Sequence, residues 1–426
     1  MKTLGFSPKQ KFCARRQTQR WLPEGDRSSS FTPSTMETQR KKFTKVSVNS
    51  ELLPVDLIME ILKKLSLKPL IRFLCVSKLW ASIIRDPYFM KLFLNESLKR
   101  PKSLVFVFRA QSLGSIFSSV HLKSTREISS SSSSSSASSI TYHVTCYTQQ
   151  RMTISPSVHG LICYGPPSSL VIYNPCTRRS ITLPKIKAGR RAINQYIGYD
   201  PLDGNYKVVC ITRGMPMLRN RRGLAEEIQV LTLGTRDSSW RMIHDIIPPH
   251  SPVSEELCIN GVLYYRAFIG TKLNESAIMS FDVRSEKFDL IKVPCNFRSF
   301  SKLAKYEGKL AVIFYEKKTS GIIGLWILED ASNGEWSKKT FALPNLAASS
   351  TNSRILKLQK FRTTDADTCE IIFTPSYAHS SLSSAIYCDL KENKVRKFVK
   401  EGWTENYLPC NADSVSSTQV ENLMFL

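Results

Sequence analysis

The sequence has no long apolar run and no paired cysteines. Its longest apolar stretch, GIIGLWIL at 321–328, is far shorter than the roughly 18 residues that a membrane-spanning helix needs. The first twelve residues contain no continuous apolar core that would mark a secretory signal. Eleven cysteines are scattered singly from Cys13 to Cys410, without a Cys-x-x-Cys pair. This usage indicates reduced thiols, so we expect a protein of the nucleus and/or cytoplasm with no membrane partner.

The sequence also lacks the usual signatures of catalysis. Its six histidines never fall at metal-ligand spacing beside a cysteine, which argues against a zinc site. It contains no Gly-x-Ser-x-Gly elbow, no His-Glu-x-x-His and no phosphate-cradling glycine loop. We interpret Cys75 and Cys163 as small core residues rather than thiol nucleophiles. We therefore expect a protein that is not an enzyme and that needs no metal or cofactor.

Negative charge is scarce: 35 Asp and Glu stand against 60 Lys and Arg, for a net charge of +25. Eleven of the basic residues lie in residues 1–45, beside three acids, and we assign residues 1–50 to a solvated, disordered basic segment. The native start is expected to be either Met1 or Met36, which lies within that segment. The charge leaves a nucleic-acid-binding regulator open as an alternative function, but the basic stretches lack the interleaved aromatic residues of such sites.

Residues 51–97 carry a helical pattern. In LPVDLIMEILKKL, at 53–65, the apolar residues recur at the spacing of one helix face. The sequence predicts three to four short helices, whose starts are marked by Pro54, Pro69, Ser77 and Asp86-Pro87. A unit of this size cannot bury all of its apolar area by itself. Part of its surface must be covered either by the rest of the chain or by another protein.

Residues 98–410 have the alternating pattern of strands, interrupted by a serine-rich loop at 128–139. Three hairpins there share a strand that ends in Asn or Asp and a base five residues later, at spacings of 108 and 107 residues: Asn174 and Arg179, Asp282 and Lys287, Asp389 and Lys394. Radial packing of successive short sheets buries every apolar face. The sequence thus predicts a small all-α unit followed by an all-β domain, a β-propeller of about six blades, with two β-sandwiches as the alternative. Residues 411–426 are assigned to a C-terminal tail.

Two parts of the chain carry a family resemblance. Many spaced positions in the helical segment follow one order: Leu53-Pro54, Asp56-Leu57, Glu60-Ile61-Leu62, Leu65, Lys68, Leu70, Arg72-Phe73, Cys75-Val76-Ser77-Lys78, Trp80 and Asp86-Pro87. In this order the segment resembles an F-box, in the form found in the large plant F-box family. Ser66 departs from it, because family members usually have a proline there. The phrases HGLICY, IYNPCTRRSITLP and IGYDPLDGNYKVV resemble the F-box-associated domains of the same plant proteins, of the kelch-like, propeller type.

The resemblance implies a non-catalytic substrate receptor of a Skp–cullin–F-box ubiquitin ligase. Its F-box would bind the Skp-type adaptor, and through it the cullin scaffold, while the β domain would bind a target protein whose identity is unknown. The residues expected to contact the adaptor are Leu53, Pro54, Leu57, Ile61, Leu62, Leu70, Val76, Ser77, Lys78 and Trp80. For Leu62 and Leu70 the alternative is that they hold the helices together.

A target could be bound by the segment ITRGMPMLRNRRGLAEE, at 211–227, which joins two expected strands. Its basic residues could hold an acidic or phosphorylated target through charge-assisted hydrogen bonds: Arg213, Arg219, Arg221 and Arg222. The alternative is a solvated loop with no ligand. A glycan-binding propeller that carries an F-box is a further alternative for the whole chain.

Overall fold

The computed structural model describes most of the chain from residue 53 onward. The described ranges are 53–100, 103–110, 114–121, 140–146, 153–166, 168–187, 192–214, 223–235, 239–245, 247–294, 301–315, 322–342, 359–363, 370–375, 384–390, 394–399 and 411–424. Two compact units are present, Met1–Ile58 and Met59–Leu426. The basic segment 1–50, the serine-rich stretch and three of the four arginines expected to bind a target lie outside the described residues.

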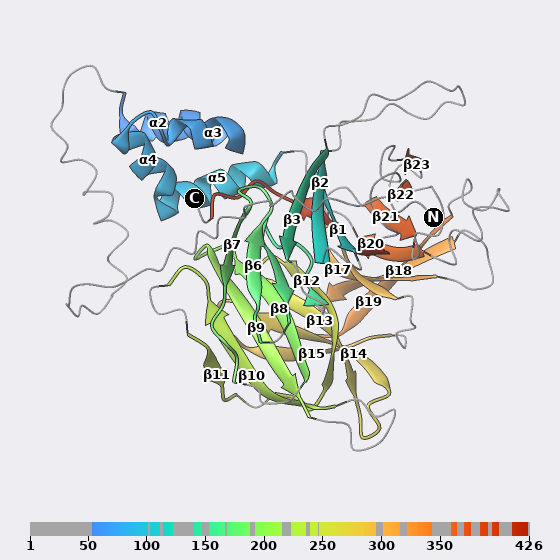
Figure 1. The fold of residues 1–426 in the computed structure, drawn as a ribbon. Coiled ribbons are helices and arrows are strands. Elements are labelled where there is room, and N and C mark those ends of the chain that lie inside the picture. Colours follow the sequence, from blue (N-terminus) through green and yellow to red (C-terminus); the bar gives the residue numbers. More distant parts are fainter. Residues whose placement is uncertain are drawn as a thin grey trace, which may run out of the picture. The chain divides into compact units, whose positions relative to one another are not determined.

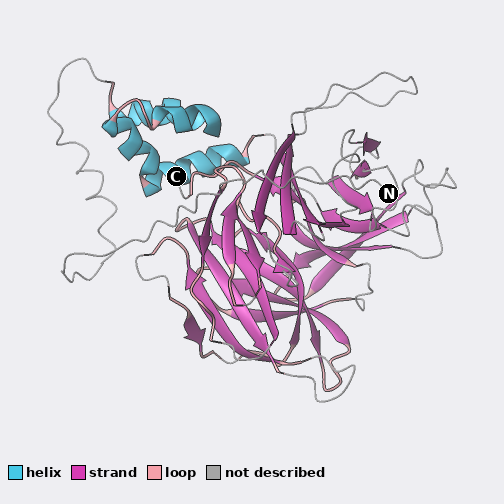
Figure 2. Ribbon diagram, in the orientation of Figure 1, coloured by secondary structure: helices cyan, strands magenta, loops and turns pink. Residues whose placement is uncertain are grey.

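The helical segment contains four helices in its described part, as the sequence predicted (Figures 1 and 2). They are α2 (Val55–Lys64), α3 (Leu67–Phe73), α4 (Lys78–Arg85) and α5 (Pro87–Leu98). The side chain of Ser77 accepts a hydrogen bond from the Trp80 backbone N–H at 3.2 Å and so caps α4. Asp86 caps α5 in the same way, with Pro87 at the first helical position. Both helix starts therefore lie where the sequence placed them.

The described strands form six four-stranded antiparallel sheets, shown as magenta arrows in Figure 2. The first contains β24 (Asn411–Gln419), β1 (Ser103–Ala110), β2 (Gly114–His121) and β3 (Ile140–Cys146). The second contains β4 (Thr153–Ile154), β5 (Ile162–Gly165), β6 (Val171–Asn174) and β7 (Arg179–Thr182). The third contains β8 (Ala192–Asp200), β9 (Asn205–Arg213), β10 (Ala225–Thr232) and β11 (Arg241–Ile243).

The three remaining sheets follow the same order of strands. The fourth contains β12 (Ser251–Ile259), β13 (Val262–Ile269), β14 (Glu275–Asp282) and β15 (Phe288–Lys292). The fifth contains β16 (Lys302–Tyr306), β17 (Lys309–Tyr315), β18 (Ile322–Asp330) and β19 (Glu335–Ala342). The sixth contains β20 (Gln359–Thr363), β21 (Glu370–Pro375), β22 (Ser384–Asp389) and β23 (Lys394–Val399).

Successive sheets meet through their first strands: β8 contacts β12, β12 contacts β16, β16 contacts β20 and β20 contacts β24. Buried apolar side chains fill the space between the second and third, the third and fourth, and the fourth and fifth sheets. Between the third and fourth, the rings of Tyr196 and Tyr265 stack with centroids 4.6 Å apart, and neither side chain is exposed. The second to fifth sheets thus bury apolar faces against one another. This is the arrangement of a β-propeller, and the six sheets agree with the expected blade number.

The sequence repeats mark equivalent turns of the blades. In the second, fourth and fifth sheets the turn before the second strand has positive φ at both central residues: His159-Gly160, Asn260-Gly261 and Glu307-Gly308. Such turns match the right-handed twist of the strands that they join, and glycine adopts positive φ without strain. The repeated Asn or Asp ends the third strand of its blade, at Asn174, Asp282 and Asp389.

The C-terminal segment differs from the sequence prediction. Residues 411–426 were expected to be a tail, but β24 pairs with β1 and takes the first place in the first sheet, from Ser103 opposite Gln419 to Arg109 opposite Asn411. The segment NADSVSSTQ has no apolar alternation, so its pattern carries no strand signal. Its strand conformation comes from pairing with a partner about 300 residues earlier in the chain.

Two cysteines and two tryptophans differ in how far they are buried. Cys163 is buried in the propeller core, and burial raises the pKa of its thiol. Cys75 is exposed in the turn after α3, so its interpretation as a core residue was wrong: the turn itself lies at the surface. Trp240 and Trp336 are partly buried, and each indole N–H donates to a carbonyl near the end of the preceding blade, Pro184 and Lys292.

Glu256 on β12 is a carboxylic acid in the propeller core. It is buried, and its Oε1 has no hydrogen-bond partner among the described residues. Burial raises its pKa well above the ordinary value, and a hydrogen bond from the Ile197 backbone opposes that rise. A raised folded-state pKa means that the native state binds the proton more tightly than the unfolded chain does. The stability that Glu256 contributes is therefore complete below its unfolded pKa and is lost as the pH rises through the folded pKa.

Replacing Glu256 by Gln is expected to stabilise the protein at high pH. Because Gln cannot ionise, the variant should gain about 1–3 kcal/mol in free energy of unfolding at pH 8 and lose this advantage toward pH 4. Denaturant titrations across this range measure the effect. Glu335→Gln, at an exposed site, is the matched control and should change the stability little at either pH. If Glu256→Gln and wild type are equally stable at pH 8, the Glu256 carboxyl group does not have a raised pKa in the folded protein.

Candidate functional site

Helix α2 is apolar on two sides. Ile58 and Leu62 are buried, as expected for the face that packs inward. Leu57 and Ile61, one turn apart, keep 51% and 52% of their surface exposed. A surface helix normally turns polar residues outward. Two large aliphatic side chains at i and i+4 on the outer face therefore mark this helix as a candidate binding surface.

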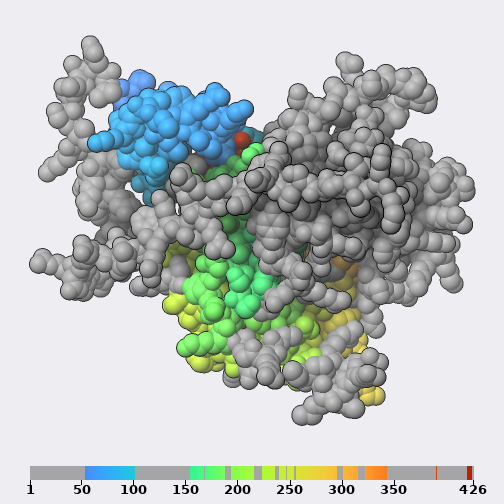
Figure 3. Space-filling view, viewed as in Figure 1, coloured from blue at the N-terminus to red at the C-terminus, as the bar shows by residue number. Residues whose placement is uncertain are grey.

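A second exposed apolar position follows α3. Val76 is 62% exposed, and the neighbouring Ser77 and Lys78 are exposed as well. Trp80 is only partly exposed, because its ring lies against Phe73 with centroids 4.7 Å apart. The contact fixes the orientation of a large aromatic ring whose remaining surface is open to a partner. Figure 3 shows atoms of the helical residues, in blue, at the surface of that view.

The residues expected from the sequence to contact an adaptor divide into two groups. Leu62 and Leu70 have no exposed surface. Seven others are exposed: Leu53, Pro54, Leu57, Ile61, Val76, Ser77 and Lys78. The tenth residue, Trp80, is partly exposed. The alternative stated for Leu62 and Leu70 therefore describes them better, since a side chain with no accessible surface supports the helices instead of meeting a partner.

Within the described helices, sequence reasoning missed two exposed apolar side chains, Ile71 and Tyr88. A signal for Ile71 was present: it directly follows Leu70 on α3, and adjacent helical residues point about 100° apart, so both cannot face the interior. Tyr88 directly follows Pro87 at the start of α5, and no periodic pattern marked it.

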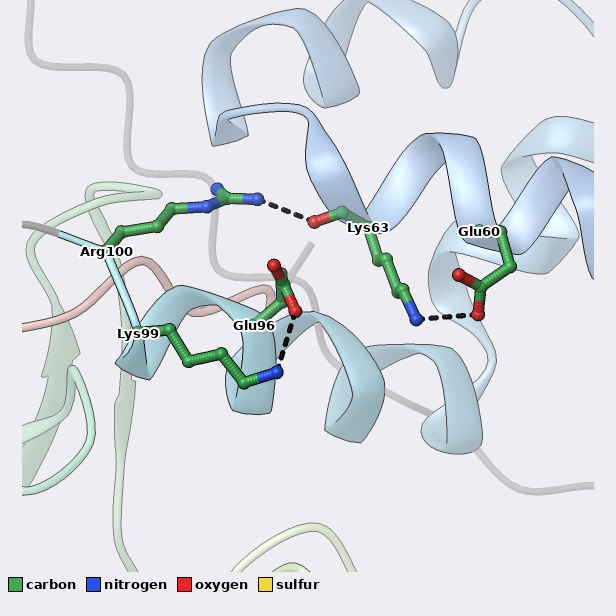
Figure 4. A network of polar contacts seen from close by, with 5 residues as sticks. All are labelled: Glu60, Lys63, Glu96, Lys99 and Arg100. Carbon is green, nitrogen blue, oxygen red and sulfur yellow. Dashed lines mark hydrogen bonds and ion pairs between the residues drawn. The ribbon is translucent and has the colours of Figure 1, made fainter.

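Polar contacts surround the end of α2 (Figure 4). Lys63 pairs with Glu60 at 2.6 Å, and Lys99 pairs with Glu96 at 3.2 Å. The hydrogen bond from Lys99 lowers the pKa of Glu96. Such exposed pairs stabilise little. The Arg100 guanidinium makes a different contact: its Nη2 donates to the Lys63 carbonyl at 2.6 Å and so satisfies a carbonyl in the last turn of α2.

The segment expected to bind a target is described only at its two ends. Arg213, at the end of β9, is half-buried, and its Nε is buried without a hydrogen-bond partner in the described structure. Arg219, Arg221 and Arg222 lie outside the described residues. Their expected role stays a prediction.

Within the described ranges, no group of three or more His, Cys, Asp and Glu side chains could hold a metal ion. The helices of the same ranges are all too short or too polar to cross a bilayer.

Two protein families match this chain. The F-box domain matches residues 51–92, and the F-box associated beta propeller domain matches residues 103–422. The chain belongs to the F-box protein family. F-box protein At2g21930 of Arabidopsis thaliana is 43% identical over 415 residues, which cover 92% of this chain and all of that protein. Putative F-box protein At1g47790 of the same plant is 36% identical over 375 residues, which cover 85% of this chain and 90% of that protein.

Among solved structures, TolB from Acinetobacter baumannii is similar with a TM-score of 0.42 and 10% identity, over 74% of this chain and 66% of that one. The F-box relatives define the broad role. F-box proteins are typically non-catalytic, and an F-box generally binds a Skp-type adaptor, so this F-box protein has a general role in substrate recognition.

Ser66, where the family usually has proline, does not disturb the F-box helices. It stands in extended conformation at the N-cap of α3, and its side chain makes no capping hydrogen bond. The first turn of α3 instead contains Pro69, which is tolerated there because the first N–H groups of a helix have no intrahelical partner.

Proposed function

We propose that this F-box protein is the substrate-recognition subunit of a Skp–cullin–F-box ubiquitin ligase. Its F-box binds the Skp-type adaptor, and its propeller binds a target protein that is then ubiquitinated on the complex. The outward apolar face of α2 carries the proposal, because Leu57 and Ile61 are exposed in a helix whose other face is already buried. The eleven cysteines are scattered singly along the sequence, which supports action in the reducing nucleus and/or cytoplasm.

Such a subunit works without chemistry of its own. Binding the adaptor and the target at the same time raises the concentration of the target near a ubiquitin-charged enzyme. The adaptor would cover the exposed aliphatic side chains of the F-box, which form the desolvated centre typical of an interface, with Trp80 as a large, partly pre-positioned anchor.

The Leu57→Ala/Ile61→Ala double variant is expected to bind a Skp-type adaptor about 100-fold more weakly than wild type. The estimate takes a loss of about 1.4 kcal/mol or more for each truncated side chain at the centre of the interface. Titration calorimetry with purified adaptor measures the affinity. Because both side chains are about half exposed, their truncation should leave the melting temperature of the protein close to that of wild type.

Leu202→Ala is the matched control for this experiment. Leu202 is an equally exposed leucine, 63% accessible, in the turn between β8 and β9. The control should bind the adaptor like wild type. If the double variant also binds like wild type, the α2 face is not the adaptor site. If the wild-type protein does not bind any Skp-type adaptor, the proposed function is wrong.

The double variant also separates the two kinds of partner in a pull-down. Proteins retained by both wild type and the variant bind the propeller and are candidate targets, whereas proteins lost with the variant reach the chain through the adaptor. A salt titration tests the nucleic-acid alternative, since binding through phosphates weakens steeply with salt and binding through an apolar face changes little.

A further inference from the structure

The last described residues of the chain connect the propeller with the F-box helices. The Oε1 of Glu421 accepts a hydrogen bond from the Leu67 backbone N–H at 3.0 Å, at the start of α3. Its Oε2 pairs with Nη1 of Arg100 at 2.9 Å. Through its other nitrogen, Arg100 donates to the Lys63 carbonyl at the end of α2. One carboxylate and one guanidinium therefore contact both sides of the α2–α3 turn, all within the unit Met59–Leu426.

The propeller end of this connection is anchored firmly. Asn422 is buried, and its Nδ2 donates to the His159 carbonyl at 2.8 Å and to the Tyr206 hydroxyl at 2.7 Å. Asn174 donates to the carbonyls of Asn422 and Met424 at 2.9 and 3.0 Å. The side chains of Val420 and Leu423, on either side, are buried as well. Glu421 thus projects from backbone that is held on both sides by the second and third blades.

At the helical end of this connection, contacts besides that of the Glu421 carboxylate hold Arg100 and helix α5 in place. The Arg100 guanidinium lies over the Phe93 ring, 5.4 Å from its centroid, which fixes its plane. Leu94 of α5 belongs to the same core cluster as Val420, and Nζ of Lys91 donates to the Leu202 carbonyl. Helix α5 is therefore packed on the propeller directly. By contrast, the α2–α3 turn is connected to the propeller through the contacts of Glu421 and Arg100.

We propose that Glu421 and Arg100 are positioning residues of the ligase: they lock the turn that follows the adaptor-binding helix α2 to the propeller, so that adaptor and target are held at a fixed separation. The proposal rests on the proposed function. Neither residue lies on the outward α2 face, so neither is needed for adaptor affinity. Their effect is on orientation, because a target held rigidly presents the same lysines to the ubiquitin-charged enzyme in each encounter.

Hydrogen exchange of the full-length protein tests the lock itself. In Glu421→Ala, the Leu67 amide loses its hydrogen-bond acceptor, so its exchange rate should rise about tenfold over wild type. The amides of β9 should keep their wild-type exchange rates. Glu421→Gln keeps a carbonyl acceptor but loses the ion pair, so it should fall between wild type and Glu421→Ala. Lys99→Ala, beside Arg100 but paired only with Glu96, is the matched control and should exchange like wild type. A Leu67 amide that exchanges equally in Glu421→Ala and wild type refutes the lock.

Autoubiquitination in a complex reconstituted with adaptor, cullin and ubiquitin-charged enzyme tests the role in positioning. Glu421→Ala and Arg100→Ala should bind the adaptor within about twofold of wild type but modify a wider set of propeller lysines, as mapped by mass spectrometry. An unchanged set of lysines refutes the positioning role. Failure of the wild-type chain to bind the adaptor refutes the proposed function instead, and the exchange experiment still decides whether the lock exists.

Discussion

A chain that ends at Cys410 is expected not to form a stable propeller. This truncation removes β24, the strand that pairs with β1 and takes the first place in the first sheet. It also removes the buried side chains of Val420 and Leu423, whose burial contributes about 1.5–3 kcal/mol each. Together with the lost strand pairing, the change approaches the whole stability of about 5–15 kcal/mol that a domain has. We expect loss of the cooperative thermal transition and of near-ultraviolet circular dichroism.

Two further samples make this result specific to β24. A chain that ends at Met424 keeps the strand and the buried segment after it, and it should melt like the full protein. A synthetic peptide of residues 411–424, added to the chain that ends at Cys410, should restore a cooperative transition in a concentration-dependent manner. If the truncated chain melts cooperatively at the wild-type temperature without the peptide, the segment is a dispensable tail, as its sequence pattern indicated.

Gly160→Ala is expected to destabilise the protein about 1–3 kcal/mol more than Gly308→Ala. Both glycines are the second central residue of equivalent turns, with φ of +91° and +82°. An alanine in this conformation is strained by about 1–3 kcal/mol at either site. At Gly160 the added Cβ would also lie 2.5 Å from the Val420 carbonyl oxygen and 2.9 Å from Cβ of Asn422, whereas nothing lies within 4 Å at Gly308. Forcing a methyl group into packed backbone adds a further penalty of about 1–3 kcal/mol.

Denaturant unfolding of the two variants measures this difference, because the shared backbone strain cancels between them. The clash at Gly160 should also displace the segment that contains Glu421, so exchange of the Leu67 amide should rise in Gly160→Ala and stay unchanged in Gly308→Ala. Equal stabilities of the two variants would mean that the C-terminal segment does not lie against the turn before β5.

The sequence predicted local features well where a single residue type controls them. Ser77 and Asp86 mark helix starts, because each side chain satisfies backbone N–H groups within three residues of itself. The repeated Asn or Asp marks the end of a strand at Asn174, Asp282 and Asp389. Repetition of these hairpins at spacings of 108 and 107 residues was enough to predict a propeller and its approximate blade number.

Burial could not be predicted in the same way. Leu57, Ile61 and Leu62 lie on one apolar stretch of α2, yet the first two are exposed and the third is buried. Periodicity shows which residues share a helix face. When the apolar face is wider than the surface that packs against it, some of its side chains stay exposed to solvent. Which side chains those are depends on what other elements pack against the helix.

The amino-acid sequence by itself determined the helix starts, the hairpin turns, the order of helices before strands and the membership of the F-box family, because all of these depend on neighbouring residues or on a repeated pattern. Only the tertiary structure decided that residues 411–419 form a strand, that Leu62 and Leu70 are covered, and that Glu421 reaches the α2–α3 turn. The strand and the Glu421 contact depend on partners about 300 residues or more away, and burial depends on which elements pack together. The free energy of such contacts is available only when the chain has folded.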